Sequence, residues 1–149
     1  MERKSARVKK ERTRLESIPP TEILSSGIQV WKNAKGDIHR DGDLPAIINA
    51  EAGFESWFQN GLEHRDNDKP AVVRFNGAKE WYQEGKLHRN GDEPAFIHPH
   101  IKEWRKHGVL HRAGDRPAII RTKKEYSPYE DMEWWIKGEY IRSENLDQR

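Results

Sequence analysis

One motif recurs along most of the chain, and this repetition limits the possible folds more than any other feature. Four stretches, 31–48, 57–73, 81–97 and 104–120, follow the pattern W-x-x-x-G-x-x-H-R-x-G-D-x-P-A-φ-φ with small variations, where φ is an apolar residue, and a shortened fifth copy covers 134–142. The motif histidines, 25, 24 and 23 residues apart, are His39, His64, His88 and His111. A unit of this length is too short for a pair of helices, so we expect small β units that stack to share a core.

Each copy contains short runs separated by a glycine turn, which predicts hairpins. Asn60-Gly61 is typical of a two-residue turn, because Gly supplies the positive φ that such turns need. Folding the chain at this turn and its equivalents predicts the cross-strand pairs Phe58–Glu63, Tyr82–Leu87, Arg105–Leu110 and Trp135–Tyr140. The second turn of each unit predicts another register, with Ile47, Val72 and Phe96 opposite Trp57, Trp81 and Trp104. We therefore predict an all-β fold, a single-layer antiparallel meander of about five hairpin repeats.

Three segments follow from this division. Residues 1–27 form a basic N-terminal leader, 28–142 the hairpin repeat domain, and 143–149 a C-terminal tail. The leader lacks Gly and Pro as far as Pro19-Pro20, which favours a helix over Met1–Leu15, and Thr21–Ser26 is expected to cover an open face of the sheet. The insertion TKKEYSPYED, at 122–131, is expected to leave the array.

Alternation along the strands assigns two faces to this sheet. One face carries the motif tryptophans beside aliphatic side chains and the motif histidines, which predicts the core. The other face carries aromatic and arginine side chains, a composition enriched in protein interfaces, next to the opposite-charge pairs Glu80–Arg89, Glu103–Arg112 and Glu133–Arg142. The protein-binding residues predicted on this face are Phe58, Tyr82, Arg65, Arg89, Arg112, Trp135 and Tyr140.

The leader has a different charge balance from the rest of the chain. Residues 1–17 hold seven basic residues against three glutamates, a net charge of +4, whereas the whole chain carries +2. Nucleic acid is therefore an alternative partner, and the candidate contacts are Arg3, Lys4, Arg7, Lys9, Lys10, Arg12 and Arg14. The leader has no aromatic residue for base stacking, so a solubilising tail or a docking helix is the competing interpretation.

Composition excludes several classes of protein. With 34% hydrophobic and 35% charged residues the chain is too polar for a thick two-layer core, yet six tryptophans are too many for a disordered one. No cysteine is present for disulfides or thiolate metal sites. Neither a membrane span nor a secretory signal is apparent, so we expect a cytoplasmic protein, in the host cytoplasm or a virion if it is viral.

The recurring His and Asp residues raise the question of a metal or acid–base site. A metal site needs three or four ligands converging on one point, and successive copies are two strands, about 10 Å, apart. We expect no metal, no cofactor and no catalytic residue, with each imidazole packed on Trp and bonded to backbone. If the protein were an enzyme, one motif histidine would affect turnover far more than the others.

The motif also resembles a known family. Trp81-Tyr82-Gln83-Glu84-Gly85-Lys86-Leu87-His88-Arg89 is similar to the MORN-type repeats, in the variant found in bacterial, phage and giant-virus proteins. The resemblance covers roughly 28–142 and departs from the usual pattern at His-Arg and at Gly-Asp-x-Pro. It implies a single-layer sheet of hairpins with a binding or scaffolding role and without catalysis.

These features lead to two functional hypotheses. The first is a non-enzymatic repeat protein that binds another protein, as an assembly component or scaffold or as a regulator, an inhibitor or antitoxin, of viral or bacterial type. The alternative is a nucleic-acid-associated protein acting through the basic leader. The identity of the partner stays open, as does pairing of two copies through the sheet edges.

Overall fold

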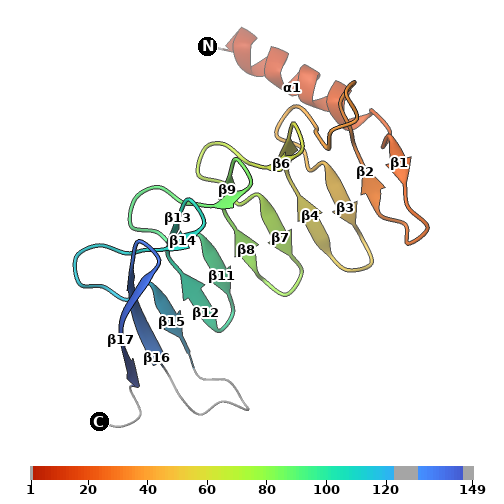
Figure 1. The fold of residues 1–149 in the computed structure, drawn as a ribbon. Helices are drawn as coiled ribbons and strands as arrows, with labels where there is room; N and C mark the ends of the chain where they lie inside the picture. The colour runs from red at the N-terminus through yellow and green to blue at the C-terminus, as the bar shows by residue number, and fades with distance from the viewer. Residues whose placement is uncertain (1, 123–130, 146–149) are drawn as a thin grey trace.

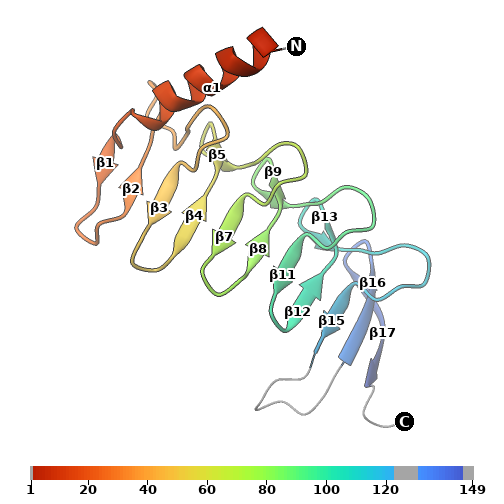
Figure 2. The same ribbon diagram turned by 180° about the vertical axis from the view of Figure 1, so that it is seen from behind.

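The computed structural model describes residues 2–122 and 131–145, and side chains from residue 7 onward. Hairpin follows hairpin along an elongated array, with one helix at its N-terminal end (Figure 1). This is an all-β antiparallel meander preceded by a helix, as predicted. The view from behind, in Figure 2, shows the same single file of hairpins, and no second sheet is stacked on the main sheet over residues 2–122 and 131–145.

Helix α1 covers Glu2–Glu16, and the strands form one long sheet and three small ones. The 11-stranded main sheet has the order β1 (Glu22–Ile23), β2 (Gln29–Val30), β3 (Ile47–Asn49), β4 (Phe54–Ser56), β7 (Val72–Arg74), β8 (Lys79–Glu80), β11 (Phe96–His98), β12 (Ile101–Glu103), β15 (Ile119–Arg121), β16 (Asp131–Ile136) and β17 (Glu139–Asn145). The two-stranded sheets are β5 (Phe58–Gln59) with β6 (Leu62–Glu63), β9 (Tyr82–Gln83) with β10 (Lys86–Leu87), and β13 (Arg105–Lys106) with β14 (Val109–Leu110).

The small hairpins have the predicted register. Phe58 pairs with Glu63, Tyr82 with Leu87, Arg105 with Leu110 and Trp135 with Tyr140. Asn60 and Gly61 have φ of 50° and 83°, the two positive values that a type I′ turn requires. Neighbouring hairpins are joined by backbone hydrogen bonds, such as Gly85 N to Glu63 O at 2.9 Å.

The predicted register of the main sheet is wrong by one residue. Ile47 lies opposite Ser56, Val72 opposite Glu80 and Phe96 opposite Glu103, so the motif tryptophans are not their partners. The reason lies in the turns: at the second one, Arg74 N bonds to Ala78 O, which makes a three-residue loop of 75–77.

Each motif tryptophan marks the point where the chain passes from the main sheet into a small hairpin. The Trp57 N–H bonds to Ala71 O near the end of the same repeat at 2.8 Å, and the Trp57 carbonyl accepts from His64 N inside the hairpin. The same pair of bonds recurs at Trp81 and Trp104. The hairpins after Trp57, Trp81 and Trp104 therefore form separate two-stranded sheets, whereas the hairpin after Trp134 stays within strands β16 and β17 of the main sheet.

The core is a ladder of tryptophans alternating with alanines, which confirms the prediction of a tryptophan core. The five motif tryptophans are each 7 or 8% exposed, and the four alanines of the Pro-Ala steps are fully buried: Trp31, Trp57, Trp81, Trp104 and Trp134, with Ala46, Ala71, Ala95 and Ala118. Alanine suits these positions because its single methyl group fits a close-packed interior that leaves none of the residue exposed.

The N-terminal segment closes one end of the array. Leu15 is the one half-buried residue between 7 and 16, and it packs on Gly42, where an added Cβ would come within 2.5 Å of the Leu15 Cδ1 atom. Strand β1 then pairs with β2 at the edge of the main sheet, so Thr21–Ser26 does not cover a face as predicted. The main sheet runs from Glu22 to Asn145, beyond both limits expected for the repeat domain.

Most of the predicted excursion at 122–131 lies outside the described residues. Among the residues that are described, no helix is long and apolar enough to cross a membrane.

Candidate functional site: the joints between repeats

The arginine of each His-Arg step, and of the equivalent Ile-Arg step in the fifth copy, lies over the ring of a motif tryptophan. In all five copies the guanidinium carbon is 3.7–4.2 Å from the centre of an indole ring of the same repeat: Arg40 on Trp31, Arg65 on Trp57, Arg89 on Trp81, Arg112 on Trp104 and Arg142 on Trp134. This is a cation–π contact, and arginine suits it because its planar group stacks and stays charged.

From the second copy onward, the same arginines bind the preceding repeat through an aspartate. Arg89 holds the Asp68 carboxylate with two bonds, Nε to Oδ1 at 2.8 Å and Nη2 to Oδ2 at 2.7 Å, and Arg112 holds Asp92 in the same way. The Asp68 carbonyl accepts from the Trp81 indole N–H at 3.0 Å. A joint between two repeats is thus made of a tryptophan, the arginine stacked on it and the aspartate of the repeat before.

These bonds explain the acidity of the joint aspartates. Hydrogen bonds from Arg89 and Arg112 hold the pKa values of Asp68 and Asp92 below their usual range. Desolvation by burial tends to raise the pKa of Asp43, but the hydrogen bonds from Arg65 and Lys69 outweigh this effect, so its pKa is lowered. The carboxylates therefore stay ionised wherever the arginines are bound.

This arrangement corrects the predicted interface. Arg65, Arg89 and Arg112 do not lie beside the aromatic residues of the second face, because their side chains are only 14–16% exposed and their donors are engaged in the joints. The predicted Glu–Arg pairs are wrong for the same reason. Glu80 is bonded by Arg74, Glu103 by Arg105 and Glu133 by Arg121.

The motif histidines tie each hairpin to the next one. Nδ1 accepts a backbone N–H from the following turn at 3.1–3.2 Å in four successive copies, from Asn60 to His39, Glu84 to His64, His107 to His88 and Lys137 to His111. Because Nδ1 accepts, any proton of the neutral ring is on Nε2, which faces Asp41, Asp66 or Asn90 in the first three copies. The predicted bond between imidazole and backbone is confirmed, whereas the side chain stacked on each motif tryptophan is arginine.

His88 is the most constrained of these histidines. It is 6% exposed, and its ring stacks on that of His107 with 4.2 Å between centroids. Desolvation by burial lowers its pKa, and the nearby His107 and Lys106 act in the same direction. These surroundings favour the neutral form of the His88 imidazole.

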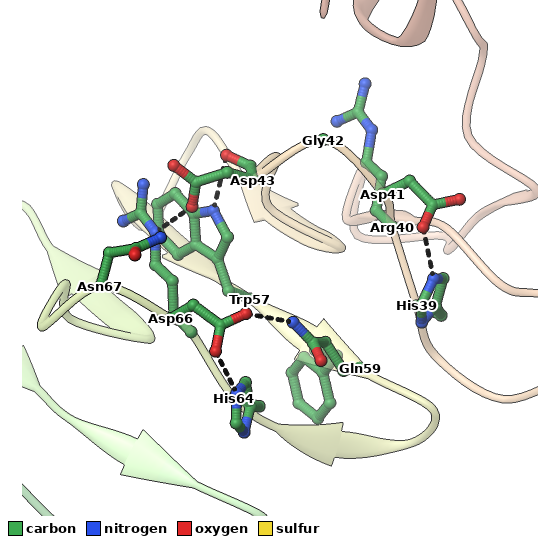
Figure 3. Close-up of a pocket in the computed structure, with 12 residues that line it drawn as sticks. His39, Arg40, Asp41, Gly42, Asp43, Trp57, Gln59, His64, Asp66 and Asn67 are labelled. Carbon is green, nitrogen blue, oxygen red and sulfur yellow. Dashed lines mark hydrogen bonds and ion pairs between the residues drawn. The ribbon is translucent and has the colours of Figure 1, made fainter.

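Gaps between successive Gly-Asp loops form polar pockets. The first has a volume of about 300 Å³ and is lined by residues of repeats one and two, including Asp43, Trp57 and His64 (Figure 3). The His39–Asp41 and His64–Asp66 pairs are drawn there as two separate pairs, each within its own repeat. Over the described residues, no group of three or more His, Asp or Glu side chains is placed to hold a metal ion.

The aromatic members of the predicted interface lie on two of the small hairpins and on the hairpin of β16 and β17. We call Phe58, Tyr82, Trp135 and Tyr140 the hairpin surface; the first three are half-buried and Tyr140 is 53% exposed. Two of them bond to glutamates of the main sheet, Tyr82 Oη to Glu80 at 3.0 Å and Trp135 Nε1 to Glu133 at 2.8 Å. These bonds fix the rings in place without removing them from the surface.

Residue 63 is an acid that the sequence interpretation did not single out. Glu63 pairs with Phe58, in the position that leucine takes in the next two hairpins. Burial and the neighbouring Glu80 raise the pKa of Glu63. The signal in the sequence was the break in the pattern, Glu63 against Leu87 and Leu110.

Helix α1 presents the predicted basic residues. Arg7, Lys9, Lys10, Arg12 and Arg14 are exposed, and Arg3 and Lys4 lie in the first turns of the helix. Arg12 and Arg14 form ion pairs with Glu16 and Glu11 along the helix.

Comparison with models of protein families, with curated proteins and with solved structures found no match to this chain.

Proposed function

We propose that this chain is a non-enzymatic, MORN-type repeat protein that binds another protein through its hairpin surface, as an assembly component or as an inhibitor or antitoxin of viral or bacterial type. The observation that supports this proposal is that the structural contacts and the exposed aromatic surface use different side chains. The recurring Trp, Arg, Asp and His residues are occupied in the joints, and the aromatic residues of the hairpin surface differ from copy to copy. Aromatic residues of that kind dominate the binding energy of many interfaces.

The hairpin surface can be tested with a double variant, Phe58→Ala with Tyr82→Ala. The tagged protein is used to capture partners from its native host lysate, with washes at low and at high salt, and bound proteins are identified by mass spectrometry. We expect one stoichiometric protein to survive high salt with the unaltered chain and to be lost with the double variant.

Phe75→Ala provides the matched control. Phe75 is an aromatic residue that is 92% exposed, and it lies in the turn after β7 rather than on a small hairpin. If Phe75→Ala and the double variant retain the partner equally, while both keep the melting temperature, the hairpin surface is not the interface.

Nucleic acid bound by helix α1 is the second candidate. The observation in its favour is that the basic side chains from Arg7 to Arg14 are exposed, while the helix contacts the array near its C-terminal end, at Leu15. Because Leu15 packs on Gly42, charge variants are a cleaner test than deletion of residues 1–17. Lys9→Ala with Lys10→Ala should weaken binding to duplex DNA or RNA and reduce its dependence on salt; unchanged affinity would exclude this role for the helix.

A further inference from the structure

The arginine of the first repeat lacks the carboxylate that its equivalents bind. In the four later copies, Arg65, Arg89, Arg112 and Arg142 each contact an aspartate of the preceding repeat at 2.6–2.8 Å. Arg40 keeps the rest of the arrangement, since it stacks on Trp31 at 3.8 Å and donates to Pro45 O at 3.1 Å. Its Nε atom, however, is buried and has no hydrogen-bond partner.

The segment after helix α1 supplies the carbonyl group that a preceding repeat would offer to Trp31, but it does not supply the carboxylate that a preceding repeat would offer to Arg40. The Trp31 indole N–H donates to Ile18 O at 3.1 Å, just as the Trp57 indole donates to Asp43 O at 3.2 Å. Ile18 therefore occupies the position of the joint aspartate. Its side chain is aliphatic and 47% exposed, so it supplies the carbonyl of the joint and no carboxylate.

A pocket lies where that carboxylate is missing. It has a volume of about 310 Å³, and Leu15, Ile18, Trp31 and Arg40 are among the residues that line it. The Arg40 side chain extends away from the His39–Asp41 pair in Figure 3. Glu16 is the acid close enough to influence Arg40, but its Oε1 atom accepts from Arg12 Nε at 2.9 Å.

We propose that this pocket binds a carboxylate, the side chain of an aspartate or glutamate of a partner protein. Four copies of the same stacked arginine in this molecule show which group completes the site, and a charge-assisted bond to a buried Nε–H is stronger than a neutral one. The pocket would place an acidic residue of the partner against the N-terminal end of the array. The proposed protein-binding role enters this inference at one point, because it identifies a partner protein as the source of the carboxylate.

A peptide copied from the chain's own joint is a suitable probe. The full-length protein is titrated with acetyl-Gly-Asp-Leu-Pro-Ala-amide, which is residues 42–46, and the arginine Nε–H resonances are followed by NMR. We expect one resonance, assigned to Arg40 by its loss in Arg40→Lys, to shift saturably, whereas the resonances of the four occupied arginines stay in place. The same peptide with asparagine for aspartate should bind at least about tenfold more weakly.

A substitution can also fill the site from within. Ile18→Asp should raise the melting temperature relative to Ile18→Asn and should abolish the response of Arg40 to the peptide. The Asp/Asn comparison separates the new carboxylate from the loss of the aliphatic side chain.

Two results would overturn the proposal. One is an Arg40 resonance that does not respond to the aspartate peptide at its highest soluble concentration. The other is a resonance that moves on Glu16→Gln and responds to the peptide only in that variant, which would mean that Glu16 fills the site in solution. Either result concerns the N-terminal pocket alone, so it is distinguishable from a failure of the hairpin surface to bind a partner.

Discussion

The joints and the hairpin surface are built on the same repeating backbone but differ in how their residue types vary between copies. In the joints, the residue types recur from copy to copy, and polar atoms find partners in the adjacent repeat, as Arg89 does with Asp68. On the hairpin surface, equivalent positions carry Phe58, Tyr82, Arg105 and Trp135. A repeat fold needs similar contacts between each pair of neighbouring repeats, so residue types that recur from copy to copy indicate a structural role. Residue types that vary from copy to copy indicate positions where specificity for a partner can arise.

The largest difference in stability between the two regions is expected when a tryptophan is removed from a joint. Trp81→Ala should destabilise the fold by about 3–5 kcal/mol, because a ring that is 7% exposed leaves a large cavity beneath Arg89. Thermal or urea unfolding measures this directly. Trp135→Ala is the matched control on the hairpin surface and should cost clearly less; equal losses would remove the distinction between the two regions.

A smaller loss is expected when the arginine of the same joint is replaced. Arg89→Met keeps much of the side-chain volume but loses both bonds to Asp68 and the cation–π contact, so we expect about 1–3 kcal/mol less stability. Arg7→Met, on the exposed helix, is the control and should be nearly neutral. A result near zero for Arg89→Met would mean that the stack and the ion pair contribute little beyond packing.

The histidine bonds between hairpins predict a pH dependence. The pKa of His88 is lower in the folded protein than the ordinary value of 6.5, so the unfolded chain binds more protons as the solution becomes acidic. The stability from this group is complete above pH 6.5 and is lost as the pH falls through the folded value. The melting temperature should therefore decrease between pH 7.5 and 5.5, within the range where histidine titrates.

His88→Gln isolates that effect, because an amide oxygen can accept the His107 N–H without titrating. The variant should show a shallower decrease than the unaltered chain over the same pH range. Glu63, whose pKa is raised, changes stability in the opposite sense in both proteins, so the difference between them reports on His88. Identical slopes would contradict the prediction.

The smallest effect is expected in a hairpin turn, and it is stabilising. Glu84 has a φ of 51° in the position that Asn60 takes in the preceding repeat, and asparagine tolerates this left-handed region better than glutamate. Glu84→Asn should raise stability by roughly 0.5–1 kcal/mol, measured by thermal unfolding. The control Lys79→Asn, in the exposed part of β8, lacks this strain and should not stabilise.

The small hairpins could be predicted because their information is local. Asn60-Gly61 both bends the chain and sets the pairing of Phe58 with Glu63, which is only five residues further along the chain. The main-sheet register could not be obtained this way. A turn such as Phe75-Asn76-Gly77 can close as two or three residues, and the observed three-residue loop occurs together with longer-range bonds, such as Ala71 N to Glu80 O and Trp81 N to Ala95 O.

The partners of the charged residues show the same limit. Arg89 and Glu80 were expected to pair across one sheet, but the chain bends at Trp81 and directs Arg89 back over the indole toward Asp68, 21 residues earlier. The unpaired Nε of Arg40 could not be predicted from the sequence either. Its significance depends on knowing that the other four arginines each bind an aspartate.

By itself, the sequence determined the repeat, the hairpins, the tryptophan core and the all-β class, because each depends on alternation and turn chemistry within one unit. The tertiary structure decided which side chains belong to the joints and which remain on the surface. That decision depends on contacts between units that are distant in sequence, such as the bonds from each joint arginine to the aspartate about 20 residues earlier.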